Sequence, residues 1–205
     1  MNSDTKVKID CGIVYDPIFE KHQTGFGHPE RTNRASFIFQ KLKDHQLLQF
    51  TKNVPVHQCT LETLSLAHNQ KYLIKAKKEV EAGLSSLSTG DTSICDQTWR
   101  VASCASGGII NAVQEVVEGR LKNAFCITRP PGHHANADKG MGFCLFNHAA
   151  VAARYAQKKL GVQKVLIVDW DVHHGNGTQD IFYGDDSVFF FSTHQSPWYP
   201  GTGGR

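Results

Sequence analysis

The chain has 205 residues, of which 40% are hydrophobic and 20% are charged, and its formal net charge is +3. This composition is typical of a globular domain with a sizeable core, so we expect a single domain over residues 1–205. Lys and Arg are spread along the chain, which argues against direct nucleic-acid binding. No apolar run reaches membrane-spanning length, and Met1 to Asp10 lack the apolar stretch of a secretory signal, so we expect no membrane association.

The cysteines are scattered, and none belongs to a C-x-x-C pair: Cys11, Cys59, Cys95, Cys104, Cys126 and Cys144. Several stand in apolar runs, where a buried thiol behaves as a small hydrophobic side chain. We therefore expect free thiols and a reducing, cytoplasmic location, or a nuclear one if the chain is eukaryotic.

Apolar runs alternate with stretches of helical period, which indicates an α/β fold with a mostly parallel sheet. In the first half we expect a strand over 9–15, a polar loop over 16–29, a helix through 35–42, an extended segment over 54–57, two short helices over 60–82 and a loop over 83–92. A longer helix should follow over 96–118, with Asp96 as its N-cap. Close packing should compensate for Gly107 and Gly108 inside this helix.

Three short apolar segments in the second half are predicted to be fully buried parallel strands, at 124–128, 165–168 and 188–191. A helix over 147–160, ended by Gly161, should connect the first two. Polar residues follow each strand directly. Because ligand sites in open parallel sheets lie beyond the carboxyl ends of the strands, these polar residues are the candidate site.

The second of these strands leads into the sequence DWDVHHGNG at residues 169–177. Side chains two apart on an extended segment face the same way, so Asp169, Asp171 and His173 should share one face. A carboxylate and an imidazole there could bind a divalent ion such as zinc, together with a third ligand from elsewhere. The alternative for this short motif is a strand end whose polar residues simply face solvent.

The first strand leads into RPPGHH at residues 129–134, where a turn presents His133 and His134. Two adjacent histidines beside a metal ion suit hydrolysis, because one imidazole can take a proton from water while the other stabilises developing charge. Each imidazole needs an orienting partner, and Asp169 and Asn176 are the candidates. A carboxylate behind one ring and an amide behind the other would give the two histidines unequal pKa values.

The segments RPPGHHANADKGMGFCLFNHAAVAA and LIVDWDVHHGNGTQDIFY closely resemble the histone deacetylase superfamily, particularly its class II-like branch and the related bacterial amidohydrolases. The match extends from HPERTNRA at residues 28–35 to PGTGG at residues 200–204. The resemblance implies a three-layer αβα fold of the arginase and deacetylase type. It also implies a zinc-dependent enzyme whose substrate is an acetylated lysine or another acetylated amine.

Carried over residue by residue, the resemblance implies the following chemical roles: Asp171 and His173 as zinc ligands, His134 as general base and acid, His133 as its charged companion, Asp169 behind His133, and Asn176 behind His134. The same resemblance makes Phe143 and Tyr199 aromatic walls of a substrate tunnel, although both could be ordinary core aromatics. Gly142 would offer its carbonyl to the substrate, and Asp91 would grip the substrate backbone at the rim unless it is a solvated loop residue.

A structural potassium ion is also implied beside the zinc. Its ligands would be the hydroxyl of Ser192 and the carbonyls of Asp169, Asp171, His173 and Thr193. A second, weaker potassium site would involve Phe182, Asp185 and Val188. Arg34 resembles an internal arginine near the acetate exit channel, with a surface helix arginine as the alternative.

Two departures from the family pattern bear on these expectations. The family usually has two asparagines where this chain has Asn147 and His148, and we expect little effect on the chemistry. The family's third zinc ligand, an aspartate, and its carbonyl-polarising tyrosine have no matching motif here. We therefore expect a deacetylase-like domain that lacks its C-terminal part.

Three hypotheses stay open. The leading one is a zinc-dependent amide hydrolase, of which this chain supplies part, that removes acyl groups from protein lysines or from small amines such as polyamines. A manganese hydrolase of the arginase type would prefer Asp-x-His-x-Asp to the Asp-x-Asp-x-His order at 169–173. The third is a catalytically inactive interaction module or decayed gene product with the same fold. The sequence indicates no particular oligomeric state.

Overall fold

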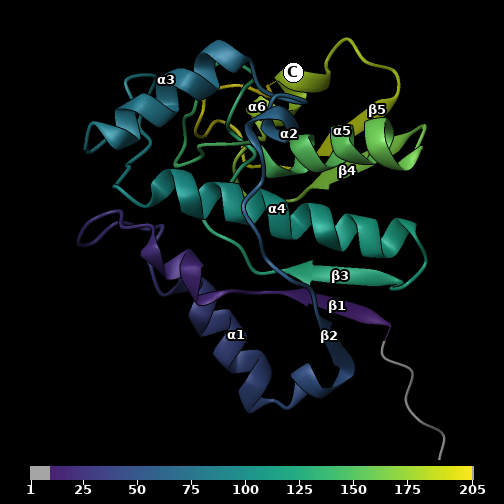
Figure 1. Cartoon of the computed structure of the whole chain (residues 1–205). Coiled ribbons are helices and arrows are strands. Elements are labelled where there is room, and N and C mark those ends of the chain that lie inside the picture. The colour runs from purple at the N-terminus through teal and green to yellow at the C-terminus, as the bar shows by residue number, and fades with distance from the viewer. Residues whose placement is uncertain (1–9, 205) are drawn as a thin grey trace, which may run out of the picture.

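The computed structural model describes residues 10–204, which form parallel strands and covering helices (Figure 1). In chain order the elements are β1 (Cys11–Val14), η1 (Pro17–Lys21), α1 (Arg34–Asp44), η2 (Leu47–Phe50), β2 (Thr51–Asn53), α2 (Leu61–Leu64), α3 (Gln70–Glu81), α4 (Thr98–Val117), β3 (Asn123–Cys126), α5 (His148–Leu160), β4 (Val165–Asp169), α6 (Asn176–Phe182) and β5 (Val188–Ser192). The expected parallel α/β organisation is therefore present, and Ile9 of the first expected strand lies outside the described residues.

The described strands form two parallel sheets, with the orders β2-β1-β3 and β4-β5. In the first sheet Cys11 pairs with Thr51 on one side and with Asn123 on the other. β3 and β4 are therefore not hydrogen-bonded neighbours among the described residues. The strand expected at 54–57 lies earlier in the chain, at Thr51–Asn53. After Asn53, only the N–H of Val54 still donates a hydrogen bond to β1, at the carbonyl of Ile13.

Helices cover both faces of the first sheet. Val14 packs in a cluster with Ala112 of α4, whereas the ring of Tyr15, directly after β1, stacks on Phe39 of α1 with ring centroids 4.1 Å apart. Since consecutive strand residues face opposite sides, α4 and α1 lie on opposite faces, and Figure 1 shows them on different sides of β1. α4 also packs along α5, so these two helices form a continuous layer.

Close packing of α4 explains its two internal glycines, as expected. A Cβ at Gly107 would collide with the carbonyl oxygen of His57, and one at Gly108 would lie 2.7 Å from Cγ1 of Val14. The expected N-cap at Asp96 is wrong. The helix begins at Thr98 after Gln97, with no side-chain cap, and the Asp96 carboxylate accepts a hydrogen bond from Nε2 of Gln97 instead.

The strands of the second half are half-buried, which corrects the expectation of full burial. In β4, Val165 and Ile167 pack on the core, while Leu166 is 63% exposed. Apolar residues occupy both faces of each strand, but the described residues cover only one face. All six cysteines are free, as expected from their spacing.

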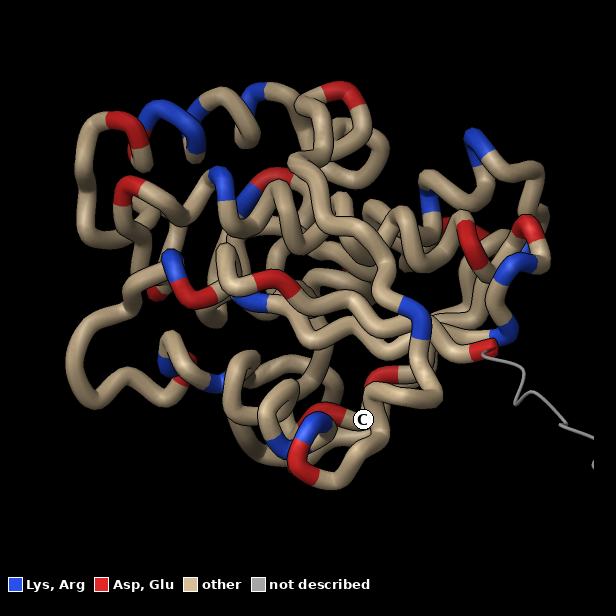
Figure 2. The backbone as a smooth tube through the Cα atoms, turned by 60° about the horizontal axis from the view of Figure 1, so that its bottom comes forward, with Lys and Arg blue, Asp and Glu red and all other residues tan. Residues whose placement is uncertain are grey.

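Figure 2 shows Lys and Arg positions interspersed with Asp and Glu positions along the backbone. Ion pairs between neighbouring turns account for part of this mixing, such as Lys77 with Glu81 on α3 at 3.7 Å. Within residues 10–204, no helix combines the length and the apolar character that a membrane span requires.

Candidate active site

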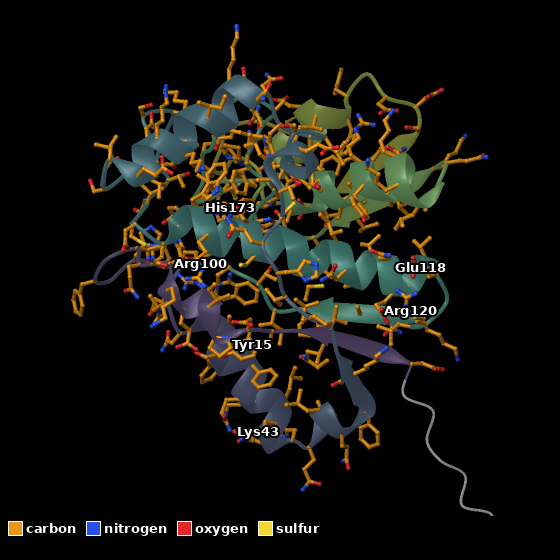
Figure 3. All side chains as sticks on the ribbon, in the orientation of Figure 1. Tyr15, Lys43, Arg100, Glu118, Arg120 and His173 are labelled. Carbon is orange, nitrogen blue, oxygen red and sulfur yellow. The ribbon has the colours of Figure 1, made fainter. Side chains whose placement is uncertain are left out.

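Loops after β3 and β4 meet although their strands do not pair. Nδ1 of His133 lies 2.9 Å from Oδ2 of Asp169, which is the last residue of β4. The N–H of Thr178 in α6 donates to the carbonyl of His133 at 3.1 Å and holds the loops together. Figure 3 shows His173 near the middle of the view, above α4, away from the periphery where Lys43 and Arg120 lie.

The two adjacent histidines have the different partners that the sequence suggested. Nδ1 of His133 donates to the Asp169 carboxylate, while Nδ1 of His134 donates to Oδ1 of Asn176 at 2.8 Å. Because a carboxylate and an amide oxygen can only accept, Nδ1 carries the proton in both rings. The ring centroids are 4.0 Å apart, and each Nε2 is left for a ligand in the pocket.

The groups behind this pair of histidines differ in charge, since one is a carboxylate and the other an amide. Burial, and then the charge of His133, lower the pKa of His134 to about 4, and the hydrogen bond to Asn176 opposes this only in part. Burial alone would raise the pKa of Asp169, but hydrogen bonds from His133 and from the N–H of Asp171 lower it overall. At neutral pH, His134 is therefore a neutral base, and Asp169 is a carboxylate behind His133.

Asp169, Asp171 and His173 converge by a different local structure from the extended one expected. β4 ends at Asp169, and the Asp169 carboxylate accepts from the N–H of Asp171 at 3.1 Å. The Asp171 carboxylate in turn accepts from the N–H of His173 at 2.8 Å. These Asx turns place Asp171 and His173 in the lining of a pocket and leave Trp170 81% exposed.

The donor chemistry of Asp171 and His173 fits a zinc ion. Oδ1 of Asp171 and Nδ1 of His173 are 3.2 Å apart, close to the separation of two ligands that each lie about 2.0–2.1 Å from one tetrahedral ion. Catalytic zinc sites use three protein ligands. No group of three His, Cys, Asp or Glu side chains with metal-binding geometry occurs within residues 10–204, so the described part of the chain offers two.

These residues line a pocket of about 550 Å³ together with Asp91, Gly142, Phe143 and Tyr199. The Tyr199 ring stands edge-on to His134, with centroids 5.0 Å apart, so this aromatic is a pocket wall. The Asp91 carboxylate accepts from the N–H of Gly142 at 2.6 Å. Gly142 has a φ of +57°, and a Cβ there would collide with the His134 ring, so this turn requires glycine.

The expected potassium ligands lie beside this pocket. The carbonyl of Asp169 accepts from the N–H of Thr193 at 3.0 Å, and the Ser192 hydroxyl lies 2.9 Å from Nδ1 of His194. At the weaker expected site, Asp185 pairs with Arg154. Hydrogen bonds from Ser187 and from Arg154 lower the pKa of Asp185 to about 2, so its carboxylate is already well satisfied.

A buried ion pair behind the pocket was missed by the sequence reasoning. Arg129 is 0% exposed, and its Nε and Nη2 each lie 2.6 Å from a carboxylate oxygen of Glu30. Arg34 lines the pocket and bonds the same carboxylate at 3.3 Å and the carbonyl of Thr128 at 3.2 Å. The segments HPERTNRA and RPPGHH contain these residues, but neither segment indicates that they touch.

Residues 28–205 match the family model described as the histone deacetylase domain. The chain belongs to the histone deacetylase family. A probable deacetylase of Archaeoglobus fulgidus is 38% identical over 194 residues, which cover 94% of this chain and 53% of that protein. Histone deacetylase 9 of Homo sapiens is 36% identical over 222 residues, which cover 94% of this chain and 22% of that protein.

A solved structure supports the same assignment. The HDA15 HD domain matches this histone deacetylase domain with a TM-score of 0.89 and 36% identity, over 95% of this chain and 56% of that one. The likeness confirms the expected three-layer α/β fold. The chain spans about half the length of the archaeal relative and of the solved domain.

Proposed function

We propose that this histone deacetylase family chain carries the proton-transfer pair and two ligands of a zinc-dependent deacetylase site. Its reaction would remove acetyl groups from lysine side chains or from small acetylated amines such as polyamines. The observation that supports this most is the joint lining of one pocket by His133, His134, Asp171 and His173. The two histidines have a carboxylate and an amide as partners, which gives them different protonation chemistry.

Each histidine has a distinct task in this proposal. His134 is neutral near pH 7, so its Nε2 would accept a proton from the attacking water and later return it to the leaving amine. His133, held by Asp169, would stabilise the negative charge that develops on the acyl group. A zinc ion held by Asp171 and His173 would supply Lewis acidity and a lowered water pKa.

The rim of the pocket would position the substrate. Phe143 and Tyr199 present aromatic walls suited to a chain of methylene groups. Asp91 would accept a hydrogen bond from a backbone N–H of the substrate, and Gly142 would offer its carbonyl. We also place a potassium ion at Ser192 and the carbonyls beside it, as a structural support for this loop region.

A second candidate function is a non-catalytic chain of the same family. The observation that favours it is the presence of only two metal donors in the site formed by residues 10–204. For both candidates we propose no contact with nucleic acid or membrane, and a cytoplasmic location or, in a eukaryote, a nuclear one.

Acetate release from an acetyl-lysine peptide and from an acetylated polyamine tests the proposal, using the full chain loaded with zinc. We expect slow, zinc-dependent release from at least one of them. His134→Ala should lower the rate by about 10²–10⁴ because the general base is lost. His45→Ala, an exposed histidine of the N-terminal half, is the matched control and should have no effect.

Two outcomes would contradict the catalytic proposal. Release that persists in His134→Ala would show that this histidine is not the base. Zinc binding that depends on Asp171 and His173 but brings no acetate release from either substrate would favour the non-catalytic candidate.

A further inference from the structure

Two neighbouring histidine rings contact the segment 198–203, which carries Tyr199. One ring belongs to His174, which follows the site residue His173 in the chain, and the other to His194, which lies just after β5. The ring centroids are 4.6 Å apart, and His174 is 2% exposed. Neither ring has a role in the proposed chemistry, yet both bind the segment that supplies one wall of the pocket.

Both ring nitrogens of His174 are hydrogen-bonded. Its Nε2 lies 2.8 Å from Oε1 of Gln179 in α6, and its Nδ1 lies 2.8 Å from the hydroxyl oxygen of Thr202. Because an amide oxygen can only accept, Nε2 of the neutral ring carries the proton, and Nδ1 accepts a hydrogen bond from the Thr202 hydroxyl. His174 therefore joins the segment 198–203 to α6.

His194 holds the next residue of the same segment. Its Nε2 lies 3.1 Å from the carbonyl oxygen of Gly203, and its Nδ1 lies 2.9 Å from the hydroxyl of Ser192 in β5. Gly203 has a φ of +77°, and a Cβ there would collide with Nε2 of His194 and lie 2.7 Å from Cγ of His174. The backbone thus packs directly on both rings, and position 203 requires glycine.

The anchored residues come shortly after Tyr199 in the chain. The carbonyl of Trp198 accepts from the N–H of Gly201 at 2.8 Å, so a tight turn joins Tyr199 to Thr202. Before this bond closes the turn, the Tyr199 ring stands edge-on to His134, with centroids 5.0 Å apart. Because the turn is short, a displacement of Thr202 should move the Tyr199 ring relative to His134.

We propose that His174, packed on His194, is a positioning residue, which anchors Thr202 and thereby holds the Tyr199 ring against the pocket. The consequence for substrate binding rests on the proposed deacetylase function, whereas the position of the ring does not. Tyr199 would contact the methylene groups of the acylated side chain equally in the ground state and in the transition state. Loss of the anchor should therefore raise KM and leave kcat nearly unchanged.

Substitutions at Thr202 test this anchor without changing either histidine. Thr202 is exposed, so Thr202→Val should fold normally, and it removes the hydroxyl that donates to Nδ1 of His174. Thr202→Ser keeps the hydroxyl and should behave as the wild type. Thr51→Val is the matched control, because it removes a hydroxyl that donates to the carbonyl of Leu48 at 2.9 Å, outside the pocket lining.

The experiment records the ring-carbon proton resonances of His134 in the full chain labelled with ¹³C-histidine. These resonances respond to the ring current of Tyr199, and Tyr199→Leu gives the shift that follows from the loss of that ring. Thr202→Val should move the resonances in the same direction by part of that shift, whereas Thr202→Ser and Thr51→Val should leave them in place. If the wild-type chain releases acetate, Thr202→Val should raise KM by roughly fourfold, the equivalent of one methylene contact, with little change in kcat.

Unchanged His134 resonances in Thr202→Val would overturn the proposal, as would an equal shift in Thr51→Val. A shift in Thr202→Ser as large as that in Thr202→Val would also overturn it, because the hydroxyl would then not be the anchor. Unchanged resonances in Tyr199→Leu would show that this ring does not lie beside His134, with the same consequence. A wild-type chain without acetate release would count against the proposed function alone, because the resonances report the ring position independently.

Discussion

At the scale of single residues, one partner atom distinguishes His133 from His134. Their rings are 4.0 Å apart and share the pocket, yet one Nδ1 meets a carboxylate and the other an amide. Burial is the main reason why the pKa of His134 is low, and the hydrogen bond to the neutral Asn176 amide raises this pKa only in part. The choice of Asn at position 176 therefore keeps the proposed base unprotonated at neutral pH.

Asn176→Asp should raise the pKa of His134 by about 1 to 3, because it places a negative charge against the imidazolium form. The measurement is a titration of the His134 ring resonances followed by ¹⁵N NMR. Asn111→Asp, at a half-buried position of α4 outside the pocket lining, is the control and should leave this titration unchanged. A pKa of His134 that stays near 4 in Asn176→Asp would contradict this account.

At the scale of elements, the sequence predicted the positions of helices and strands better than the burial of the strands. α5 begins after Asn147, whose side chain accepts from the N–H of Ala150, and ends at Gly161 with a φ of 73°, both readable from residue type. The burial of a strand depends on what covers it, which an apolar run does not specify. The strand predicted at 165–168 is therefore present as β4, but Leu166 within it is exposed and not buried as expected.

The same limit applies to the site. Its histidines and aspartates stand in two compact motifs, so their residue types and spacing could be found in the sequence. Glu30 and Arg129 are 99 residues apart, and neither local period nor composition predicts a contact over that separation. The pair joins the segment before α1 to the loop after β3, and so fixes one wall of the pocket.

Glu30→Gln should lower the free energy of unfolding by about 3–5 kcal/mol, because it leaves the Arg129 guanidinium buried without its counter-charge. Urea denaturation at pH 7 measures this change. Glu81→Gln removes a carboxylate from the exposed pair with Lys77 and should cost at most about 1 kcal/mol. An equal decrease in the free energy of unfolding in the two variants would show that the buried Arg129 pair stabilises the fold no more than an exposed pair does.

At the scale of the whole molecule, several buried histidines make stability depend on pH. Burial lowers the pKa of each of four histidines to about 4, from the usual 6.5: His22, His68, His134 and His148. Between those values the unfolded chain binds more protons than the folded chain, so the free energy of unfolding falls as the pH drops from about 6.5 to 4. One pKa unit is worth about 1.4 kcal/mol, so the combined fall should be steep.

His68→Gln removes one of these four groups. It should therefore reduce the slope of the free energy of unfolding against pH, over this range, by close to the contribution of one bound proton. Urea denaturation at several pH values between 4 and 7 gives the slope. His45→Gln, at an exposed position, should leave the slope as in the wild type. An undiminished slope in His68→Gln would show that burial of this ring does not contribute to acid sensitivity.

One face of the β4-β5 sheet is left exposed by residues 10–204 and should make this chain self-associate. Leu166 pairs with Phe189 and Val168 with Phe191, and these four side chains are between 45% and 67% exposed on one face. A contiguous apolar patch of this kind favours association. Leu166→Lys combined with Phe189→Lys should shift the chain toward monomer in sedimentation equilibrium, whereas Phe37→Lys, at a 61% exposed position on α1, should not. A wild-type chain that stays monomeric up to its solubility limit would show that this face does not drive association.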